Sequence, residues 1–437
     1  MDRKASVRAE QMRRLLGHAR ERLGLGIGFH LWDGSTVPGD LAPDALAIRL
    51  ADENLVSALI RNPRLETLAN LWVAKRIDIV NGTMFDLVKQ RPSVKTRAFR
   101  KSLDKGLALK TALMFLTLPR GGPWPLEAQP SEKPGSGDTA ENKENIAYHY
   151  DVSNAFYALF LDREMVYTCG YATDWDVAAA GDLDRMQADK LEMICRKLRL
   201  KPGDHMLDIG CGWGALVCHA ALHHGVTAHG VTLSEEQVAY AKEKVRRLGL
   251  EDRVTIELRD YTTVTGPYDK ISSIGMQEHI GLDQHDTYYR TVKRVLRPGG
   301  IFLNHAITRP AKKKRFRRKN KEFALLTKYI FPGGELDHIG DTLMRLEQNG
   351  FEIHDVEGWR EHYQRTCRLW HDRLLANYDA AVAEVGEPKT RLWLAYLGAC
   401  SIAFERNTVG VFQTVATRKQ RGASGMPPTR GDLYRSA

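Results

Sequence analysis

The sequence has no apolar stretch that approaches the length needed to span a bilayer, so we expect any membrane contact to be peripheral. It also lacks a secretory signal at its start. Met1–Leu25 is basic and roughly amphipathic, but it contains no apolar core followed by a small-residue cleavage site. The sequence therefore predicts neither a membrane-spanning nor an exported protein.

Cysteine is scarce, with six residues in 437. No two of them have CxxC spacing, and no Cys/His cluster along the sequence suggests zinc, so we expect no metal site. Scattered single cysteines fit a reducing cytoplasm. The six residues are Cys169, Cys195, Cys211, Cys218, Cys367 and Cys400.

Acidic residues are outnumbered, because 54 Asp and Glu residues face 64 Lys and Arg residues, which gives a formal net charge of +10. This excess permits an anionic partner, either nucleic acid or an acidic lipid surface, and composition does not choose between them. A hydrophobic content of 43% is ordinary for a protein with a packed core. The length allows two domains, or one large domain with an appendage.

The first 118 residues predict a small α+β module. Ile27–Trp32 and Ala45–Leu50 have the pattern of strands, and Leu55–Ile60 and Leu65–Trp72 that of helices. Such a module is either a lipid-associated accessory domain or a purely structural or dimerising one. Residues 119–145 are rich in Pro, Gly, Ser and alternating charges, which predicts a flexible linker.

Beyond Lys201 strands alternate with helices, as a parallel α/β sheet requires. The pattern predicts a Rossmann-like domain over residues 146–418, followed by a disordered tail over 419–437 that is rich in Gly, Pro, Ser and Arg. The expected strands are His205–Ile209, Ala228–Thr232, Val254–Leu258, Lys270–Ile274, Ile301–His305 and Val409–Thr417. The expected helices are Ala215–His223, Glu235–Leu248, Asp286–Val295, Tyr363–Val385 and Lys389–Glu405.

The sharpest signal is a glycine-rich turn between the first of these strands and its helix. The spacing is GxGxG over Gly210, Gly212 and Gly214, with Asp208 two residues before the first glycine. Glycines let the backbone approach a ligand closely. A lone GxGxxG also serves dinucleotides, and a tight turn needs no ligand at all. The spacing with the preceding acid favours the amino-acid end of S-adenosylmethionine, and therefore a methyltransferase.

Further cofactor contacts are expected where the next strands end. Thr232 stands where many Rossmann-like enzymes carry an acid for the ribose, and Gln237 follows one turn into the helix. Ser234 has a simpler role as a helix N-cap. Asp260 and Tyr261 follow the third strand, where a residue that contacts adenine would lie.

Two polar loops are expected at the carboxyl edge of the sheet, where ligands bind in this architecture. Glu278 follows the fourth strand and His305 ends the fifth, so we interpret them as candidates for proton handling. Aromatic residues are dense upstream, in 148–171. They fit an ordinary core, although their ring faces would also favour a sulfonium or a carbocation.

Seven separated motifs together resemble one family. In order, they are YHYDVSNAFYALFLD, MVYTCGY, LDIGCGWG, GVTLSEEQ, GMQEHIG, FLNHAI and HYQRTCRLWHDRL. Residues 145–418 are thus similar to the cyclopropane-fatty-acyl-phospholipid synthases, a group that includes the mycolic acid cyclopropane synthases. The resemblance implies a class I methyltransferase domain with a helical acyl-binding cap, and a homodimer.

The resemblance also implies a reaction. The cis double bond of a phospholipid acyl chain attacks the methyl group of S-adenosylmethionine, a bound bicarbonate removes a proton from the resulting carbocation, and a cyclopropane ring closes. The implied bicarbonate pocket consists of Cys169, Glu278, His305, Ile307 (through its backbone) and Tyr363. The implied cofactor contacts add Tyr167 and Thr168 to Asp208, the three glycines, Thr232, Gln237, Asp260 and Tyr261.

Two alternatives stay open at this point. The same chemistry without ring closure gives a fatty-acyl C-methyltransferase that makes a methyl-branched or methylated unsaturated chain. A basic RNA methyltransferase is the alternative from another class, although no second nucleic-acid motif supports it.

One basic run bears on this choice. Lys312–Lys321 carries eight cations in ten positions. For an enzyme whose substrate lies in a bilayer, attraction to anionic headgroups explains such a run better than nucleic acid does. We therefore expect a cytoplasmic protein that binds the inner leaflet of the cell membrane peripherally.

Overall fold

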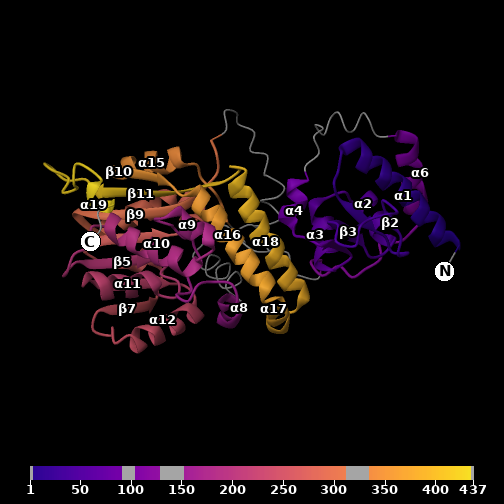
Figure 1. Cartoon of the computed structure of the whole chain (residues 1–437). Helices are drawn as coiled ribbons and strands as arrows, with labels where there is room; N and C mark the ends of the chain where they lie inside the picture. Colours follow the sequence, from indigo (N-terminus) through magenta and orange to yellow (C-terminus); the bar gives the residue numbers. More distant parts are fainter. Residues whose placement is uncertain (1–2, 91–103, 128–151, 312–333, 435–437) are drawn as a thin grey trace. The chain divides into compact units, whose positions relative to one another are not determined.

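The computed structural model describes residues 3–90, 104–127, 152–311 and 334–434 (Figure 1). These residues form two compact units. The first contains residues 3–90, 104–127 and 386–398, and the second contains 152–311, 334–385 and 399–434. The basic run Lys312–Lys321 lies outside the described residues.

The first unit is a four-stranded mixed sheet with helices, in the strand order β2-β1-β3-β4. β1 pairs parallel with β3 and antiparallel with β2, and β4 pairs antiparallel with β3. The strands are β1 (Gly28–His30), β2 (Thr36–Val37), β3 (Ala47–Leu50) and β4 (Ile77–Val80). The helices are α1 (Arg3–Leu23), α2 (Asn54–Arg61), α3 (Leu65–Val73), α4 (Met84–Lys89) and α6 (Lys105–Leu116). The α+β pattern expected from the sequence is present.

The start of the predicted linker belongs to this unit. Leu126 is buried, and its backbone N–H donates to the Asn70 side chain (2.9 Å). The ring of Trp124 lies against the guanidinium groups of Arg76 and Arg120. Residues 119–127 are therefore packed rather than extended as a free linker. Residues 128–145 lie outside the described part.

The second unit contains a seven-stranded sheet in the order β10-β11-β9-β8-β5-β6-β7. The strands from β9 to β7 in this order run parallel, whereas β11 and β10 are added antiparallel. The strands are β5 (His205–Ile209), β6 (Thr227–Thr232), β7 (Val254–Leu258), β8 (Tyr268–Ile274), β9 (Leu296–Thr308), β10 (Phe351–Gly358) and β11 (Gly410–Arg418). The predicted Rossmann-like α/β class is thus confirmed.

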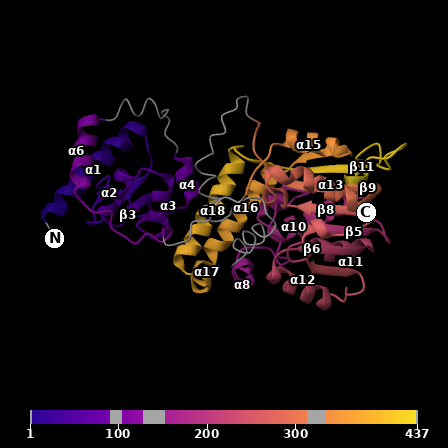
Figure 2. The same ribbon diagram turned by 180° about the vertical axis from the view of Figure 1, so that it is seen from behind.

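Helices cover both faces of this sheet (Figures 1 and 2). One core joins α10 (Leu183–Lys197), α11 (Ala215–His224) and α12 (Glu235–Arg247) to one face, and another joins α13 (His285–Val295) and α15 (Ile339–Gln348) to the other. Alternate residues of β5 show why: Met206 belongs to the first core, and Leu207 and Ile209 to the second. A strand buried on both faces is typically a nearly continuous apolar run, and Asp208 is the polar exception in β5.

Shorter helices and the C-terminal helices complete the unit. They are α8 (Asn154–Ala158), α9 (Trp175–Ala180), α16 (Arg360–Ala376), α17 (Tyr378–Val385), α18 (Glu387–Glu405, shared between the units), α19 (Gly431–Tyr434) and the 3-10 turns η1 (Tyr261–Thr263), η2 (Gln277–His279) and η3 (Leu282–Gln284). The single helix expected over Tyr363–Val385 is wrong. It breaks at Asn377, whose side chain donates to Leu159 O (2.9 Å) and to Arg373 O (3.1 Å).

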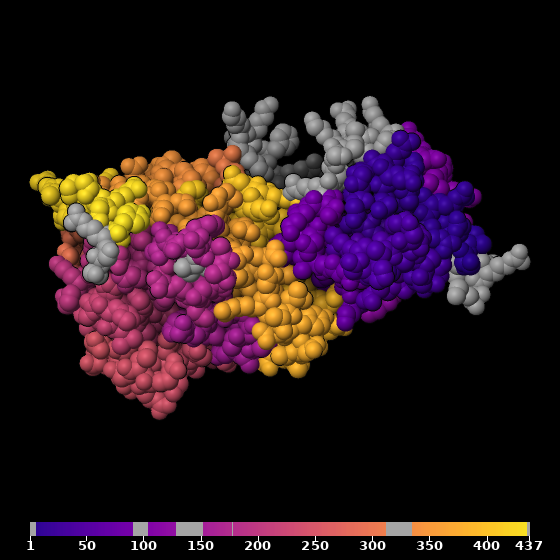
Figure 3. All heavy atoms as spheres, in the orientation of Figure 1, coloured from indigo at the N-terminus to yellow at the C-terminus, as the bar shows by residue number. Residues whose placement is uncertain are grey.

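The tail was expected to be disordered, and the structure contradicts this for residues 419–434. α19 packs on α10 with Leu433 buried, and Arg199 pairs with Asp432 (2.9 Å). Figure 3 shows this part of the chain as yellow surface at the left edge. One buried leucine and two ion pairs, Arg199–Asp432 and Arg430–Asp355 (2.8 Å), fix a segment whose composition is otherwise typical of a free tail.

Within the described residues, no helix combines the length and the apolar character that crossing a bilayer would require.

Candidate active site at the carboxyl ends of the strands

The glycine turn after β5 has the backbone that the sequence predicts. Gly210, Gly212 and Gly214 have φ values of 78°, 54° and 82°, which L side chains rarely adopt. A Cβ on Gly214 would lie 3.1 Å from the Cβ of Ala241, so the turn also packs tightly on α12. On Gly212 a Cβ would meet no atom within 4 Å. The turn is therefore tight against the protein and open on its outer side, as a ligand contact requires.

Asp208 lies buried at the base of this turn. Its carboxylate accepts a hydrogen bond from the Ser272 hydroxyl (2.6 Å) on β8. Burial raises its pKa to about 6, although the bond from Ser272 and the charge of Lys190 oppose the rise. The aspartate is thus held beside the turn, and a buried cation favours its ionised form.

That cation, Lys190, was missed in the sequence. Its ammonium group donates to the Thr168 hydroxyl (2.8 Å), and burial lowers its pKa to about 8. Gln187, one turn earlier on α10, donates to Thr168 O (2.9 Å). Both polar side chains lie on the buried face of α10, with Met186 and Leu191. A lysine and a glutamine at apolar positions of an amphipathic helix are the signal that could have revealed them.

Thr232 and Gln237 lie together where β6 ends. The Thr232 hydroxyl donates to Gln237 Oε1 (2.7 Å), and Ser234 caps α12 by accepting from Gln237 N (3.3 Å). The N-cap role and the cofactor role expected for this segment are therefore compatible. Asp260 and Tyr261 follow β7 at the edge of the sheet, where Asp260 accepts from Thr262 N (2.8 Å).

Glu278, after β8, is buried beside β9. Its Oε1 accepts from Ile307 N (2.5 Å), which joins two of the predicted residues directly. Its Oε2 is buried and has no hydrogen-bond partner among the described residues. Burial raises the pKa of Glu278 to about 7, despite the bond from Ile307. An unpartnered carboxyl oxygen of this kind is costly unless a ligand completes it.

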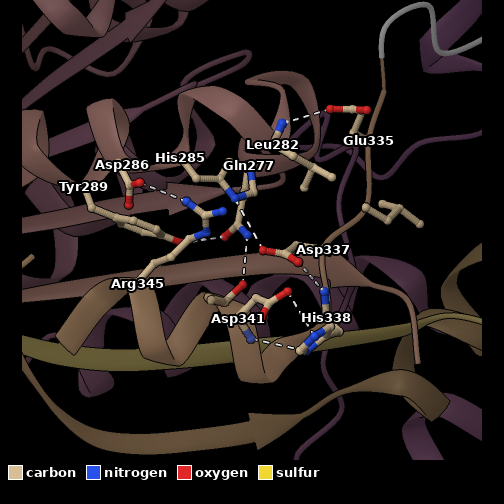
Figure 4. Close-up of polar contacts among 12 residues, drawn as sticks. Gln277, Leu282, His285, Asp286, Tyr289, Glu335, Asp337, His338, Asp341 and Arg345 are labelled. Carbon is tan, nitrogen blue, oxygen red and sulfur yellow. Dashed lines mark hydrogen bonds and ion pairs between the residues drawn. The ribbon is translucent and has the colours of Figure 1, made fainter. Parts of the chain in front are cut away.

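Polar contacts on both sides hold η2, the turn that carries Glu278 (Figure 4). The backbone carbonyl of Glu278 accepts from Glu335 N (2.9 Å), and the Glu335 carboxylate accepts from Leu282 N (2.9 Å). The side chain of Gln277 makes three buried hydrogen bonds. Its partners are Tyr289, Asn304 and Thr342. Neighbouring groups thus fix the position of Glu278, although its own Oε2 has no hydrogen-bond partner among the described residues.

His305 ends a chain of buried hydrogen bonds. Lys197 Nζ donates to Gln413 Oε1 (2.8 Å), and Gln413 Nε2 lies 3.2 Å from His305 Nδ1. A lysine can only donate, so the Gln413 oxygen faces Lys197 and its amide N–H groups face the imidazole. Nδ1 therefore accepts, and the proton of the neutral ring is on Nε2. That atom is buried without a partner among the described residues.

Two of the predicted residues, His305 and Cys169, contact Trp359, and Tyr363 follows it one turn later on α16. The indole ring lies edge-on to His305, with ring centres 5.5 Å apart. The Trp359 carbonyl accepts from Tyr363 N (3.0 Å) and lies 3.8 Å from the Cys169 thiol. Cys169, Glu278, His305 and Tyr363 are all buried. Burial holds the pKa of Cys169 and of Tyr363 well above their ordinary values, so both keep their protons.

Aromatic rings connect this group to the glycine turn. Trp213, inside the turn, contacts Tyr157, which contacts Tyr167 (centres 5.1 and 5.4 Å apart). Tyr167 contacts Trp370, which lies edge-on to Tyr363 (5.1 and 6.0 Å). The predicted cofactor and proton-handling residues are thus joined by a continuous aromatic wall, as a site for a cationic reactant would need.

A pocket of about 660 Å³ opens beside the site. Its lining includes Thr308, which follows Ile307, and Gly358 and Arg360, which flank Trp359. None of the four buried residues lines it directly. The remaining lining is mixed, with Trp175, Ile339 and Phe412 beside Arg309 and His362 among others.

No Cys/His cluster is visible along the sequence, but the fold brings three such residues together. Cys195, His219 and His224 each offer a ligand atom, and these atoms lie within 4.8 Å of one another. They come from α10 and α11, so no spacing along the sequence could show them together. All six cysteines are free thiols.

The fold and the site first define a class. A parallel-rich sheet flanked by helices, with a glycine turn after β5 and helix α11 beginning at the turn, is the class I fold of S-adenosylmethionine-dependent methyltransferases. The family model described as mycolic acid cyclopropane synthetase matches residues 138–414. The chain therefore belongs to this family, which confirms the resemblance found in its motifs.

Individual relatives and solved structures are similar to the chain as well. The chain is 33% identical over 421 residues to a probable fatty acid methyltransferase of Pseudomonas putida, covering 95% of this chain and 98% of the relative. It is 38% identical over 273 residues to the cyclopropane-fatty-acyl-phospholipid synthase of Escherichia coli K12, covering 62% of this chain and 66% of that synthase. Mycolic acid cyclopropane synthase CmaA1, complexed with SAH and CTAB, matches with a TM-score of 0.59 and 31% identity, covering 63% and 98%.

Proposed function

We propose that the protein transfers a one-carbon group from S-adenosylmethionine to the cis double bond of an unsaturated phospholipid acyl chain and forms a cyclopropane ring. One observation carries this proposal: Glu278 Oε2 and His305 Nε2 are buried without a hydrogen-bond partner among the described residues, at the sheet edge where the glycine turn follows β5. The name of one relative, a cyclopropane-fatty-acyl-phospholipid synthase, supports the same chemistry.

The residues fit S-adenosylmethionine. The outer side of Gly212 is open, and Asp208 and Lys190 lie buried at the base of the turn. The turn and Asp208 would hold the amino-acid end, and Thr232 with Gln237 the ribose. Tyr167 and Thr168 would border the methyl group, and Asp260 and Tyr261 the adenine. When bound, the cofactor supplies an electrophilic methyl group on a positively charged sulfur.

The residues also fit a small anion such as bicarbonate, which when bound supplies a proton acceptor. His305 presents an N–H whose direction Gln413 fixes, and Glu278 presents an oxygen that accepts or donates according to its protonation. Cys169 and Tyr363 keep their protons beside them. These groups would hold the anion and orient it, while the aromatic wall excludes water and stabilises positive charge on the acyl chain.

A methyl-branched or methylated unsaturated product is the second candidate. Two relatives that match over more than nine tenths of the chain are named probable fatty acid methyltransferases, which favours this alternative specifically. The two candidates share the substrate and the methyl transfer, and they differ in whether the ring closes after proton loss.

The pocket of about 660 Å³ is our candidate for access of the lipid. We further propose that α16 and α17 form the acyl-binding cap, that the first unit is a lipid-associated module, and that the chain is a homodimer. Lys312–Lys321 would draw it to the anionic inner leaflet, at about 1 kcal/mol per near-surface cation. Neutralising this run should weaken binding to anionic vesicles and leave cofactor affinity unchanged; equal vesicle binding by the variant contradicts this role.

The test is a transfer assay with methyl-labelled S-adenosylmethionine and vesicles of a cis-unsaturated phospholipid, with RNA in a parallel reaction. Label in the lipid is expected from the wild type, at a rate strongly reduced in Glu278→Gln. Ring protons in the NMR spectrum of the product identify a cyclopropane, whereas a methyl signal identifies the second candidate. Label in RNA, or no transfer to lipid, would refute the proposal.

A further inference from the structure

A cluster of metal-type ligands lies on the α10–α11 side of the second unit, among residues to which the proposed reaction gives no role. Cys195 is fully buried on α10, whereas His219 and His224 on α11 each have a side chain that is 18% exposed. Their ligand atoms lie within 4.8 Å of one another. In a tetrahedral zinc site, neighbouring sulfur and nitrogen ligands are about 3.3–3.7 Å apart, given bond lengths of about 2.3 and 2.0 Å. Small side-chain rotations would therefore close the set around an ion.

Glu192 completes the surroundings. It lies one turn before Cys195 on α10, and its Oε2 is 3.3 Å from His219 Nε2 and 3.0 Å from His224 Nε2. Its Oε1 accepts a hydrogen bond from Arg196 Nε (2.7 Å), which holds the carboxylate in place. A fixed carboxylate against both rings is the arrangement that orients metal-binding histidines and supplies negative charge.

We infer that Cys195, His219 and His224 form a binding site for one zinc ion, with the Glu192 carboxylate as their orienting partner. A mixed set of one sulfur and two imidazole nitrogens suits a borderline ion such as zinc, and is poor for magnesium or calcium, which require oxygen ligands. Binding replaces the Cys195 proton: the S–H bond breaks, a sulfur–zinc bond forms, and one proton is released to solvent. The partial exposure of the two histidines leaves a side for a water molecule as fourth ligand.

Such an ion would join two helices that carry the proposed cofactor site. α11 begins at the glycine turn, and α10 carries Lys190 and Gln187, which hold Thr168. The two helices lie side by side (Figure 1). The ion would therefore stabilise the fold, independently of which methyl acceptor the protein uses.

The experiment uses the full chain, without a histidine tag and after treatment with a chelator. Zinc is titrated by calorimetry, and bound metal is counted after dialysis. One ion per chain is expected, with submicromolar affinity, and Tm should rise by about 5 °C at a hundredfold excess over Kd. Cobalt should give the near-ultraviolet charge-transfer band of a thiolate ligand.

Variants assign the ligands. Cys195→Ala should abolish the cobalt–thiolate band, and His224→Asn, near the surface, should weaken zinc binding at least a hundredfold. His223→Asn is the matched control, because the His223 ring lies tilted against that of His219 (centres 4.5 Å apart) yet stands outside the ligand set. It should bind as the wild type does. Weak binding of several ions, unchanged binding by His224→Asn and Cys195→Ala, or loss of binding in His223→Asn would each overturn the inference. None of these readouts depends on methyl transfer, so their failure leaves the proposed function untouched.

Discussion

Replacing Gln413 by methionine tests the role given to the buried chain from Lys197 to His305. The substitution keeps the length of the side chain but removes both hydrogen bonds. Without a donor at Nδ1, the imidazole is free to place its proton there, and Nε2 then presents a lone pair to the anion. A lost hydrogen bond to a charged group costs about 1.5–3 kcal/mol. Since about 1.4 kcal/mol is tenfold in rate, we expect kcat to fall about 10- to 100-fold.

The assay is methyl transfer to cis-unsaturated phospholipid vesicles, with the KM for S-adenosylmethionine measured in parallel. That KM should be unchanged, because Gln413 lies on β11, away from the glycine turn. Thr417→Val is the matched control: it removes a hydrogen bond to His354 (2.8 Å) from the same strand. Thr417→Val should lose about 1 kcal/mol of stability and Gln413→Met about 1.5–3 kcal/mol, but only Gln413→Met should lose rate.

Nitrogen NMR of the imidazole supplies a readout that a purely structural role would not move. The wild type should show His305 protonated at Nε2, and Gln413→Met a mixture of tautomers. A wild-type ring protonated at Nδ1 would refute the argument, and so would a variant whose kcat stays within twofold of the wild type.

Three further substitutions test separate features. Burial raises the pKa of Glu278 from 4.5 to about 7. Its ionisation therefore lowers the free energy of unfolding by about 3 kcal/mol above pH 7, and has no effect below pH 4.5. Denaturant titrations should show that Glu278→Gln is more stable than the wild type at pH 8 but not at pH 4. Gly214→Ala should lower Tm more than Gly203→Ala, because both have positive φ but only the first meets a neighbour; equal losses would contradict this. Leu433→Ala should lower the free energy of unfolding by about 2–3 kcal/mol, because Leu433 is buried, whereas Tyr434→Ala, at an exposed residue, should change it very little. Equal effects of the two substitutions would mean that the tail does not pack on the unit.

The order of elements in the second unit could be predicted because its signals are local. β5 matches the expected span His205–Ile209, and α11 exceeds its expected span by one residue. Apolar runs bounded by glycines are sufficient to predict the strands and helices in that part of the chain. The sequence did not predict α10, α15 or β10. Polar residues on the buried face of α10 interrupt its apolar periodicity, and β10 lies outside the alternating strand–helix pattern because it pairs with the antiparallel β11.

Part of the site could also be predicted from the sequence. Glu278 and His305 could be placed at one edge because parallel strands bring their carboxyl ends together, and the bond from Ile307 to Glu278 bears out that proximity. Lys190, Gln413 and the cluster around Cys195 could not be placed. Each acts through a partner between 22 and 216 residues away, and periodicity carries no information about such pairs.

The protonation states of the buried groups decide what the site can hold. Cys169 and Tyr363 keep their protons, and burial with the charges of Lys190 and Lys197 holds the pKa of His305 far below its ordinary value, so its ring is neutral. The proposed anion site thus offers donors without a net charge of its own, apart from Glu278, which is half ionised near pH 7. A simple anion would meet a repelling carboxylate whenever Glu278 ionises. An anion that carries its own O–H can donate to the carboxylate or accept from the carboxylic acid, so it fits in both states. Bicarbonate has that property, which is a physical reason to prefer it over chloride or nitrate.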